Sequence, residues 1–279
     1  MSRPDAAVAD PVVARVVHRS VVVDHAGARP VVKLMLNLLP GGRRFEAGMD
    51  IGFMVPGHAA DDVQRGLRRY TIESVGQVPF EDSVDITFYV RNHAAPTGTS
   101  MAETLSGLEQ GDSVAVYGPF PYPFYPPMGS RSNMILIGAG CGVVPFRWLA
   151  HKVQARKLDW MGKVLMLEGP QTGLEHLYLN EPGVDQDQYF DSATQRAFEA
   201  LKTRYSATAL DRAESTNANM DAMWRLMGQG SVFVYLAGYR AVAQAMDEAM
   251  SGYLRLPGRW EEAKSELVRN GHWLEYLYD

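Results

Sequence analysis

The residues best suited to chemistry form a glycine-rich turn in the middle of the chain. The apolar run 134–137 ends at Gly138, and Gly140 and Gly142 follow at alternate positions. Pro145 then stands at the beginning of a helix-like pattern. A strand, a glycine-rich turn and a helix in this order bring backbone amides and a helix N-terminus up to a phosphate group, because glycine leaves room for the ligand. A single turn of this kind is weak evidence, so the surrounding pattern decides its meaning.

The composition is that of a globular protein with room for two ordinary domains. The chain has 279 residues, of which 46% are hydrophobic and 21% charged, and its net charge is −5. A negative net charge argues against nucleic acid as the main partner. No apolar run approaches ~20 residues, so we expect no membrane span. The first residues lack the apolar core of a signal peptide, and we predict a cytoplasmic protein.

Metal ligands are sparse in the sequence. Cys141 is the single cysteine, which excludes internal disulfides and any four-cysteine metal site carried by this chain alone. The seven histidines show no metal-ligand spacing. We therefore predict no metal site and interpret Cys141 as a small buried residue in the glycine turn.

The first half of the chain is predicted to be a small antiparallel β-structure. Short β-type runs alternate with turn signals such as 40–42 and 56–57, a spacing typical of a barrel or a sandwich. Residues 99–108 carry the single helix-like pattern there. The β-type runs are 11–17, 31–39, 51–55, 69–74, 84–90 and 113–117.

Strand and helix patterns alternate in the second half, which predicts a mostly parallel sheet covered on both faces. Residues 119–127, PFPYPFYPP, form the link, because proline lacks the amide donor that a helix or interior strand needs. The predicted fold is an antiparallel β-barrel domain over 1–127 and a doubly wound parallel-sheet domain over 128–279. The expected strands are 134–137, 163–167, 205–210, 232–237 and 273–278, and the expected helices follow residue 143 and cover 192–204, 220–227, 240–251 and 260–270.

Five segments, in the right order, resemble motifs of the plant-type ferredoxin–NADP reductase superfamily. Residues 68–71, RRYT, resemble its R-x-Y-[ST] flavin motif, and 111–119 contain the glycines where its barrel domain closes. Residues 138–147 resemble its G-x-G-x-x-P-[FL]-R nicotinamide-nucleotide motif, and 234–238, VYLAG, its V-Y-x-C-G segment. The aromatic end 273–278 is similar to the end that stacks on the flavin. The resemblance implies an FAD-binding barrel, an NAD(P)-binding domain and an oxidoreductase that passes electrons from NADH or NADPH through FAD.

The resemblance implies an FAD site on the barrel. A pyrophosphate needs a fixed cation, and Arg68 offers planar, bidentate donors, whereas Tyr70 offers a π-face and a hydroxyl. Thr71 is implied to place its hydroxyl near the flavin N5, where the hydride arrives, and is therefore a candidate catalytic residue. The other candidate FAD-binding residues are Gly98, Thr99 and Ser100 at a helix start, and the strand residues Tyr89 and Arg91.

The second domain is implied to bind the pyridine nucleotide. Gly138, Gly140, Gly142 and Pro145 would hold its phosphates, with Gly238 near the nicotinamide and Thr172 near the ribose or phosphates. Asp211 and Arg212 occupy the place of a Ser-Arg pair that binds a 2′-phosphate in the family. An aspartate repels a phosphate whereas an arginine attracts it, so the choice between NADH and NADPH stays open, with a slight lean to NADH.

Two departures from the family pattern concern catalysis. Ala237 replaces the family's cysteine, so no thiol flanks the nicotinamide. Counting back from the end makes Tyr278 the aromatic that stacks on the flavin and moves away for hydride transfer, with Tyr276 as the alternative. The same count puts Tyr276 where plant members carry a glutamate, and Glu275 is one place off.

The electron acceptor is expected to be a separate protein, such as a ferredoxin, a flavodoxin or an oxygenase component. A basic face for an acidic acceptor is one interpretation of Arg43, Arg44, Arg65, Arg68 and Arg69, and scattered surface arginines are the other. One alternative is a flavin-binding electron-transfer subunit that never meets NAD(P)H. A conventional Rossmann dehydrogenase is a weaker one, because it leaves the barrel pattern unexplained.

Overall fold

The computed structural model describes residues 10–25, 28–55, 57, 66–91, 100–129, 131–138, 140–155, 161–167, 176–178 and 209–278. The chain divides into two compact units, Met1–Pro123 and Phe124–Asp279. The sequence placed the border between residues 127 and 128, a few residues after the observed one, and both borders lie in the proline-rich segment 119–127. Among the described residues, no helix is long and apolar enough to cross a membrane.

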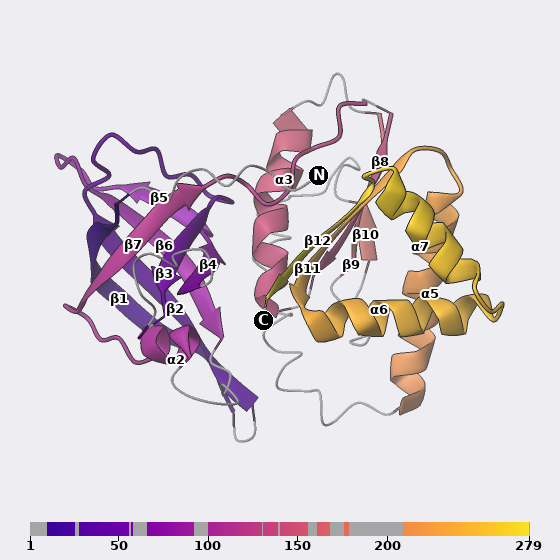
Figure 1. The fold of residues 1–279 in the computed structure, drawn as a ribbon, viewed down its shortest axis with the longest axis horizontal. Helices are drawn as coiled ribbons and strands as arrows, with labels where there is room; N and C mark the ends of the chain where they lie inside the picture. Colours follow the sequence, from indigo (N-terminus) through magenta and orange to yellow (C-terminus); the bar gives the residue numbers. More distant parts are fainter. Residues whose placement is uncertain are drawn as a thin grey trace. The chain divides into compact units, whose positions relative to one another are not determined.

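In the part of the first unit that the structure describes, an antiparallel sheet is accompanied by one short helix (Figure 1). Its seven strands follow the order β4-β3-β7-β1-β2-β6-β5. The helix α2, Met101–Ser106, inserts Met101, Ala102 and Leu105 into the core. The strands are β1 (Val12–His25), β2 (Ala28–Leu38), β3 (Asp50–Met54), β4 (Leu67–Thr71), β5 (Ser74–Gln77), β6 (Val84–Arg91) and β7 (Ser113–Phe120).

The sheet of the first unit curls over one apolar core, which brings β4, at one end of the strand order, against β6, next to the other end. Phe53 on β3 stacks on Phe88 of β6, with ring centroids 5.4 Å apart, and Tyr70 on β4 lies 5.7 Å from the same ring. β3 and β4 lie at one end of the strand order and β6 near the other. These contacts therefore close the antiparallel structure around one apolar core, as the predicted barrel requires.

The second unit is a five-stranded sheet in the order β10-β9-β8-β11-β12 (Figure 1). β8, β9, β11 and β12 are parallel, and the short β10 pairs antiparallel with β9. The strands are β8 (Asn133–Gly138), β9 (Val164–Leu167), β10 (His176–Tyr178), β11 (Val232–Tyr239) and β12 (Trp273–Tyr278). The helices among the described residues are the 3-10 turn η2 (Gly140–Val143), α3 (Val144–Ala155), α5 (Ala209–Met227), α6 (Arg240–Leu254) and α7 (Arg259–Arg269).

Alternate strand residues of this sheet enter two separate cores. Met134 and Leu136 of β8 pack with Phe146 and Leu149 of α3 on one face. Ile135 and Ile137 point to the other face, where residues of α5, α6 and α7 cover them. A strand that is apolar at every position is buried on both sides, so the doubly wound fold predicted for this half is confirmed.

Two of the local expectations were wrong or incomplete, and a third is not tested. Residues 205–210 were expected to be extended, but α5 already begins at Ala209. Its first turns are polar and lack the apolar period that marked 220–227, although Ala, Arg and Glu favour helix. β5 was missed because it is short, polar and largely exposed. The expected helix 192–204 lies outside the described residues.

Candidate functional site

Strand β4 carries the RRYT motif, and its pairing with β3 decides where each side chain lies. Phe53 is opposite Arg68 and Ile51 is opposite Tyr70, so these four side chains share one face of the strand pair. On that face Phe53, Ile51 and Tyr70 pack in or against the barrel core. The Tyr70 ring packs edge-on against Phe53 at 5.7 Å. Arg68 is exposed. The structure therefore presents a solvent-accessible guanidinium beside a half-buried aromatic ring.

The other face of β4 holds a buried polar pair. Thr71 is opposite Asp50 in the register, and its hydroxyl Oγ1 donates a hydrogen bond to Asp50 Oδ1 at 2.8 Å. Asp50 is 1% exposed and Thr71 7% exposed. Arg69 lies on this face too, with its guanidinium 4.1 Å from the centre of the Phe120 ring. A carboxylate this deeply buried is costly unless it is bonded, so Asp50 is an unusual residue for a barrel strand.

Tyr89 is held by neighbours on the barrel. Its hydroxyl donates to Glu73 Oε1 at 2.9 Å, and Lys33 Nζ lies 3.2 Å from the other oxygen of that carboxylate and 5.3 Å from the Tyr89 ring centre. Arg91 ends β6 and is half-buried. The contacts of Tyr89 and Arg91 with FAD stay predictions.

Ser100 has a clear local role. It is the N-cap of α2, where its side-chain oxygen accepts the amide hydrogen of Glu103 at 3.0 Å. The cap uses one lone pair of this oxygen, and the hydroxyl can still donate its hydrogen. Glu103 adds an acidic side chain to the first turn. An acidic first turn weakens the attraction of a helix start for phosphate, and the contact of Ser100 with FAD stays a prediction. Gly98 and Thr99 lie outside the described residues.

The glycine turn of the second unit packs directly on strand β11. A Cβ at Gly142 would come within 2.1 Å of the Ala237 carbonyl oxygen and 3.0 Å of the Gly238 amide nitrogen. Gly238 itself has φ +149°, a conformation that favours glycine. Pro145 is the second residue of α3, where its fixed φ suits the first turn.

Parallel register brings the second-domain candidates to one edge of the sheet. Gly138 on β8 is level with Ala237 on β11, which is level with Tyr276 on β12. The chain leaves β8 toward β9 on one side, while β11 lies on the other, so the strand order reverses between β8 and β11. Ligands of open α/β sheets bind at such a point, outside the carboxyl ends of the strands. The structure thus brings Gly138, Gly142 and Gly238 together at this edge.

Alternate residues of the terminal strand β12 pack in the two different cores of the second unit. Tyr276 packs with the α3-side core, with its ring 6.3 Å from Phe124 and nearly perpendicular to it. Trp273 belongs to the opposite core. The Tyr278 backbone ends β12 level with Tyr239, and the side chain of Tyr278 lies outside the description.

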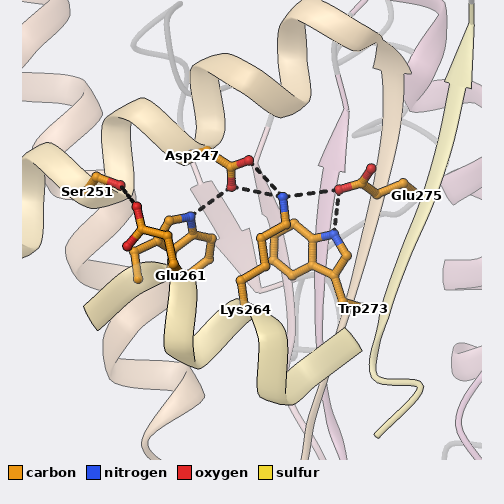
Figure 2. A network of polar contacts seen from close by, with 7 residues as sticks. Asp247, Ser251, Glu261, Lys264, Trp273 and Glu275 are labelled. Carbon is orange, nitrogen blue, oxygen red and sulfur yellow. Dashed lines mark hydrogen bonds and ion pairs between the residues drawn. The ribbon is translucent and has the colours of Figure 1, made fainter. Parts of the chain in front are cut away.

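Glu275 is engaged in a charged network that joins β12 to α6 and α7 (Figure 2). Lys264 Nζ bonds both oxygens of Asp247, at 2.9 and 2.8 Å, and lies 3.3 Å from Glu275 Oε1. The indole of Trp273 donates to Glu275 at 2.7 Å, and that of Trp260 to Asp247 at 2.8 Å. Glu275 therefore serves to fix the strand.

Tyr235, in the VYLAG segment, is a structural residue. It is 2% exposed, and its hydroxyl donates to the Tyr125 carbonyl at 2.7 Å. Burial raises the pKa of the Tyr235 phenol above its ordinary value, so the group stays neutral and keeps this hydrogen bond.

Several candidates cannot be placed. Thr172 lies outside the described residues, and only the backbone of Asp211 and Arg212, in α5, is described. Within the described part of the chain, no three His, Cys, Asp or Glu side chains gather as a metal site. The sequence reasoning missed Asp50, although an acid inside the apolar run 49–55 was a signal that could have found it.

A closed antiparallel unit followed by a doubly wound parallel unit is the fold of solved ferredoxin–NADP⁺ reductases. The enzyme from Plasmodium falciparum superposes with a TM-score of 0.55 at 16% identity, over 96% of both chains. No protein-family model matches the chain.

Sequence comparison leads to reductases with the same name. The ferredoxin–NADP reductase of a Synechocystis species is 23% identical over 281 residues, 94% of this chain but 66% of that protein. The one from a Spirulina species is 22% identical over 276 residues, 95% of this chain and 94% of that protein. The resemblance to the ferredoxin–NADP reductase superfamily is thereby confirmed over nearly the whole chain.

Proposed function

We propose that the protein is an FAD-containing NAD(P)H oxidoreductase that passes electrons from a reduced pyridine nucleotide to a separate redox protein. The observation that carries the proposal is the presence, in one chain, of RRYT on a closed β-barrel and of a glycine turn at the switch point of a parallel sheet. The names and fold of the relatives support it.

The residues of the first unit fit FAD. An exposed arginine beside a half-buried aromatic ring suits a ligand that is anionic at its pyrophosphate and flat and apolar at its ring. Arg68 would bind the pyrophosphate, Tyr70 would pack against the flavin, and Thr71 would meet the flavin N5 edge. When bound, FAD supplies the conversion between a two-electron hydride donor and a one-electron acceptor.

The carboxyl edge of the second unit fits the pyridine nucleotide. The backbone of the turn around Gly138, Gly140 and Gly142 would bind the phosphates, and Gly238 would leave room for the nicotinamide. NADPH and NADH are both proposed as donors. The Plasmodium falciparum reductase has been solved with 2′P-AMP, which supports testing a 2′-phosphate first, with Arg212 as its candidate contact.

A ferredoxin is the proposed acceptor, because the relatives are named for it. A flavodoxin or an oxygenase component is the alternative acceptor. Four of the five arginines suggested for a basic docking face have contacts within the first unit. Arg44 pairs with Glu46, and Arg43 donates to the backbone oxygens of Gly118 and Asp10. Arg44, Arg68 and Arg69 are exposed and stay candidates for the docking role, and Arg65 lies outside the described residues.

Anaerobic titration tests the proposal. The protein, purified with FAD or reconstituted with it, is titrated with NADPH and in parallel with NADH. Bleaching of the flavin band by one equivalent of coenzyme, followed by recovery on adding oxidised ferredoxin, is expected. Arg68→Ala should weaken FAD retention by about tenfold or more, through loss of a charge-assisted bond, whereas Arg15→Ala, an exposed arginine on β1, should not. A protein that cannot bind FAD, or whose FAD no coenzyme reduces, contradicts the proposal.

A further inference from the structure

Asp50 is the most deeply buried acid among the described residues, and the roles proposed above do not use it. It lies at the start of β3 with 1% of its surface exposed, and Ile51, the next residue, is fully buried. Burying a carboxylate costs several kcal/mol unless hydrogen bonds compensate, so such groups persist mainly where they are bonded and useful. Strained or costly groups of this kind are candidates for functional roles.

The bond between Asp50 and Thr71 fixes the direction of the Thr71 hydroxyl. A threonine hydroxyl has one hydrogen to donate and two lone pairs to accept with. Its hydrogen goes to Asp50 Oδ1 at 2.8 Å. Toward any other neighbour, the Thr71 oxygen can therefore only accept a hydrogen bond. A carboxylate oxygen can only accept, so the pair cannot reverse while Asp50 is ionised.

We infer that Asp50 is a positioning residue for the flavin, which acts by holding the Thr71 hydroxyl as a hydrogen-bond acceptor. This inference rests on the proposed function, in which Thr71 meets the N5 edge of FAD. N5 carries a lone pair in the oxidised ring and an N–H in the reduced ring. An acceptor-only Thr71 therefore complements the reduced ring and gives no hydrogen bond to the oxidised ring. Asp50 thus makes Thr71 favour reduced FAD over oxidised FAD.

The register explains why Asp50, rather than another acid, has this role. Directly opposed residues of an antiparallel pair have side chains on the same face, and Asp50 is opposite Thr71. Arg69, two residues before Thr71, lies on the same face and packs on Phe120. The Asp50–Thr71 pair is therefore held by β3 and β4, two neighbouring strands of the first unit.

The test compares Asp50→Asn, Thr71→Val and the double variant, each bound to oxidised FAD labelled with ¹⁵N at N5. Asparagine keeps the size of the side chain, and with its amide NH2 turned to Thr71 it donates to Thr71 Oγ1, which directs the Thr71 hydrogen toward N5. We expect Asp50→Asn to shift the ¹⁵N5 resonance in the direction of a donated hydrogen bond. In the Thr71→Val background the same substitution should have no effect, because no hydroxyl remains. FAD affinity should change by less than about fivefold in Asp50→Asn.

Asp85→Asn is the matched control. Asp85 is a half-buried acid of the same barrel, and its Oδ1 accepts from Asn37 Nδ2 at 2.8 Å. It should leave the N5 resonance unchanged. If Asp50→Asn does not retain FAD, Asp50→Glu, which keeps the charge and displaces it by one methylene, is measured in the same two backgrounds. A shift that needs the Thr71 hydroxyl is again expected.

Two outcomes overturn the inference. In one, Asp50→Asn lowers thermal stability but leaves N5 unchanged, which is the result of a purely structural pair. In the other, the shift persists in full in the Thr71→Val background, so that the hydroxyl does not carry it. Failure of the wild-type protein to bind FAD is a different result, since it removes the proposed function itself.

Discussion

Gly142 has less freedom to change than Gly138 of the same turn, whose added Cβ would come no closer than 3.0 Å to a neighbour. An added Cβ would lie 2.1 Å from the Ala237 carbonyl oxygen, closer than real Cβ contacts come. The obstacle is the backbone of β11, which cannot rotate away as a side chain can. The glycine is thus required by the packing of the turn on the strand, independently of any ligand.

Gly142→Ala should therefore lower the free energy of unfolding of the second unit by at least about 1–3 kcal/mol, the range for overpacking. Gly252, near the end of α6, has nothing within 4 Å of its would-be Cβ. Gly252→Ala should instead raise stability by about 0.5–1 kcal/mol, because alanine favours helix. Urea unfolding of the three proteins measures both changes. Equal stability of Gly142→Ala and wild type would show that the turn does not pack on β11 as described.

The two C-terminal tyrosines should behave differently when changed to serine. Tyr276 is part of the α3-side core, so Tyr276→Ser should lower the unfolding free energy by about 2–4 kcal/mol. Tyr278 is proposed to cover the flavin where the nicotinamide must stack, so Tyr278→Ser should tighten coenzyme binding by about 2–13-fold. Thermal unfolding and coenzyme titration separate the two effects. Unchanged coenzyme affinity and flavin fluorescence in Tyr278→Ser would remove Tyr278 from the mechanism.

At the scale of elements, the edge strand β12 is held by more than its pairing with β11. Lys264 on α7 contacts Asp247 on α6 and Glu275 on β12, and its ammonium lies 4.8 Å from the Trp273 ring (Figure 2). Lys264 is 20% exposed, so its charge is better shielded from solvent than that of a surface pair. One side chain therefore ties together two helices and the strand that ends the sheet.

Lys264→Met keeps the apolar stem and removes the charge, and should lower the free energy of unfolding by about 1–2 kcal/mol. Adding Glu275→Gln should cost less in the Lys264→Met background than in the wild type, because the two residues share one network. Lys152→Met, an exposed lysine near the Trp148 ring, is the control and should change stability by less than about 0.5 kcal/mol. Additive effects of Lys264→Met and Glu275→Gln would contradict a shared network.

The sequence predicted best those elements whose pattern is continuous and apolar. Strands β8, β11 and β12 and the helix after β8 were expected close to where they lie, because buried strands and amphipathic helices carry their own signal. β5 and the polar start of α5 carry no such signal, since pairing or tertiary contact forms them. The Asp50–Thr71 pair could not be read from spacing, because residues 21 apart in sequence meet only through the β3–β4 register. The glycine turn, by contrast, was recognisable because its chemistry is local.

At the scale of the whole molecule, the proposed function assigns one ligand to each of two units with separate cores. The FAD contacts proposed on β4 lie within Met1–Pro123, and the coenzyme contacts at the ends of β8 and β11 lie within Phe124–Asp279. A ligand that binds only the folded form stabilises what it binds, by about 2.7 kcal/mol at one hundred times its Kd. Each ligand should therefore leave its own protection pattern along the chain.

Hydrogen exchange of the protein with and without each ligand measures this pattern. FAD should slow exchange most in β3 and β4, and NADP⁺ most in residues 138–146 and 236–239, because amides near a bound ligand open less often. Comparison of NADP⁺ with NAD⁺ at equal concentration then decides the coenzyme: stronger protection by NADP⁺, including residues near Arg212 in α5, indicates that the 2′-phosphate is recognised. Equal protection by both would mean that Asp211 and Arg212 do not discriminate. Protection by FAD confined to the second unit would contradict the assignment of the flavin to the barrel, because the RRYT strand lies in the first.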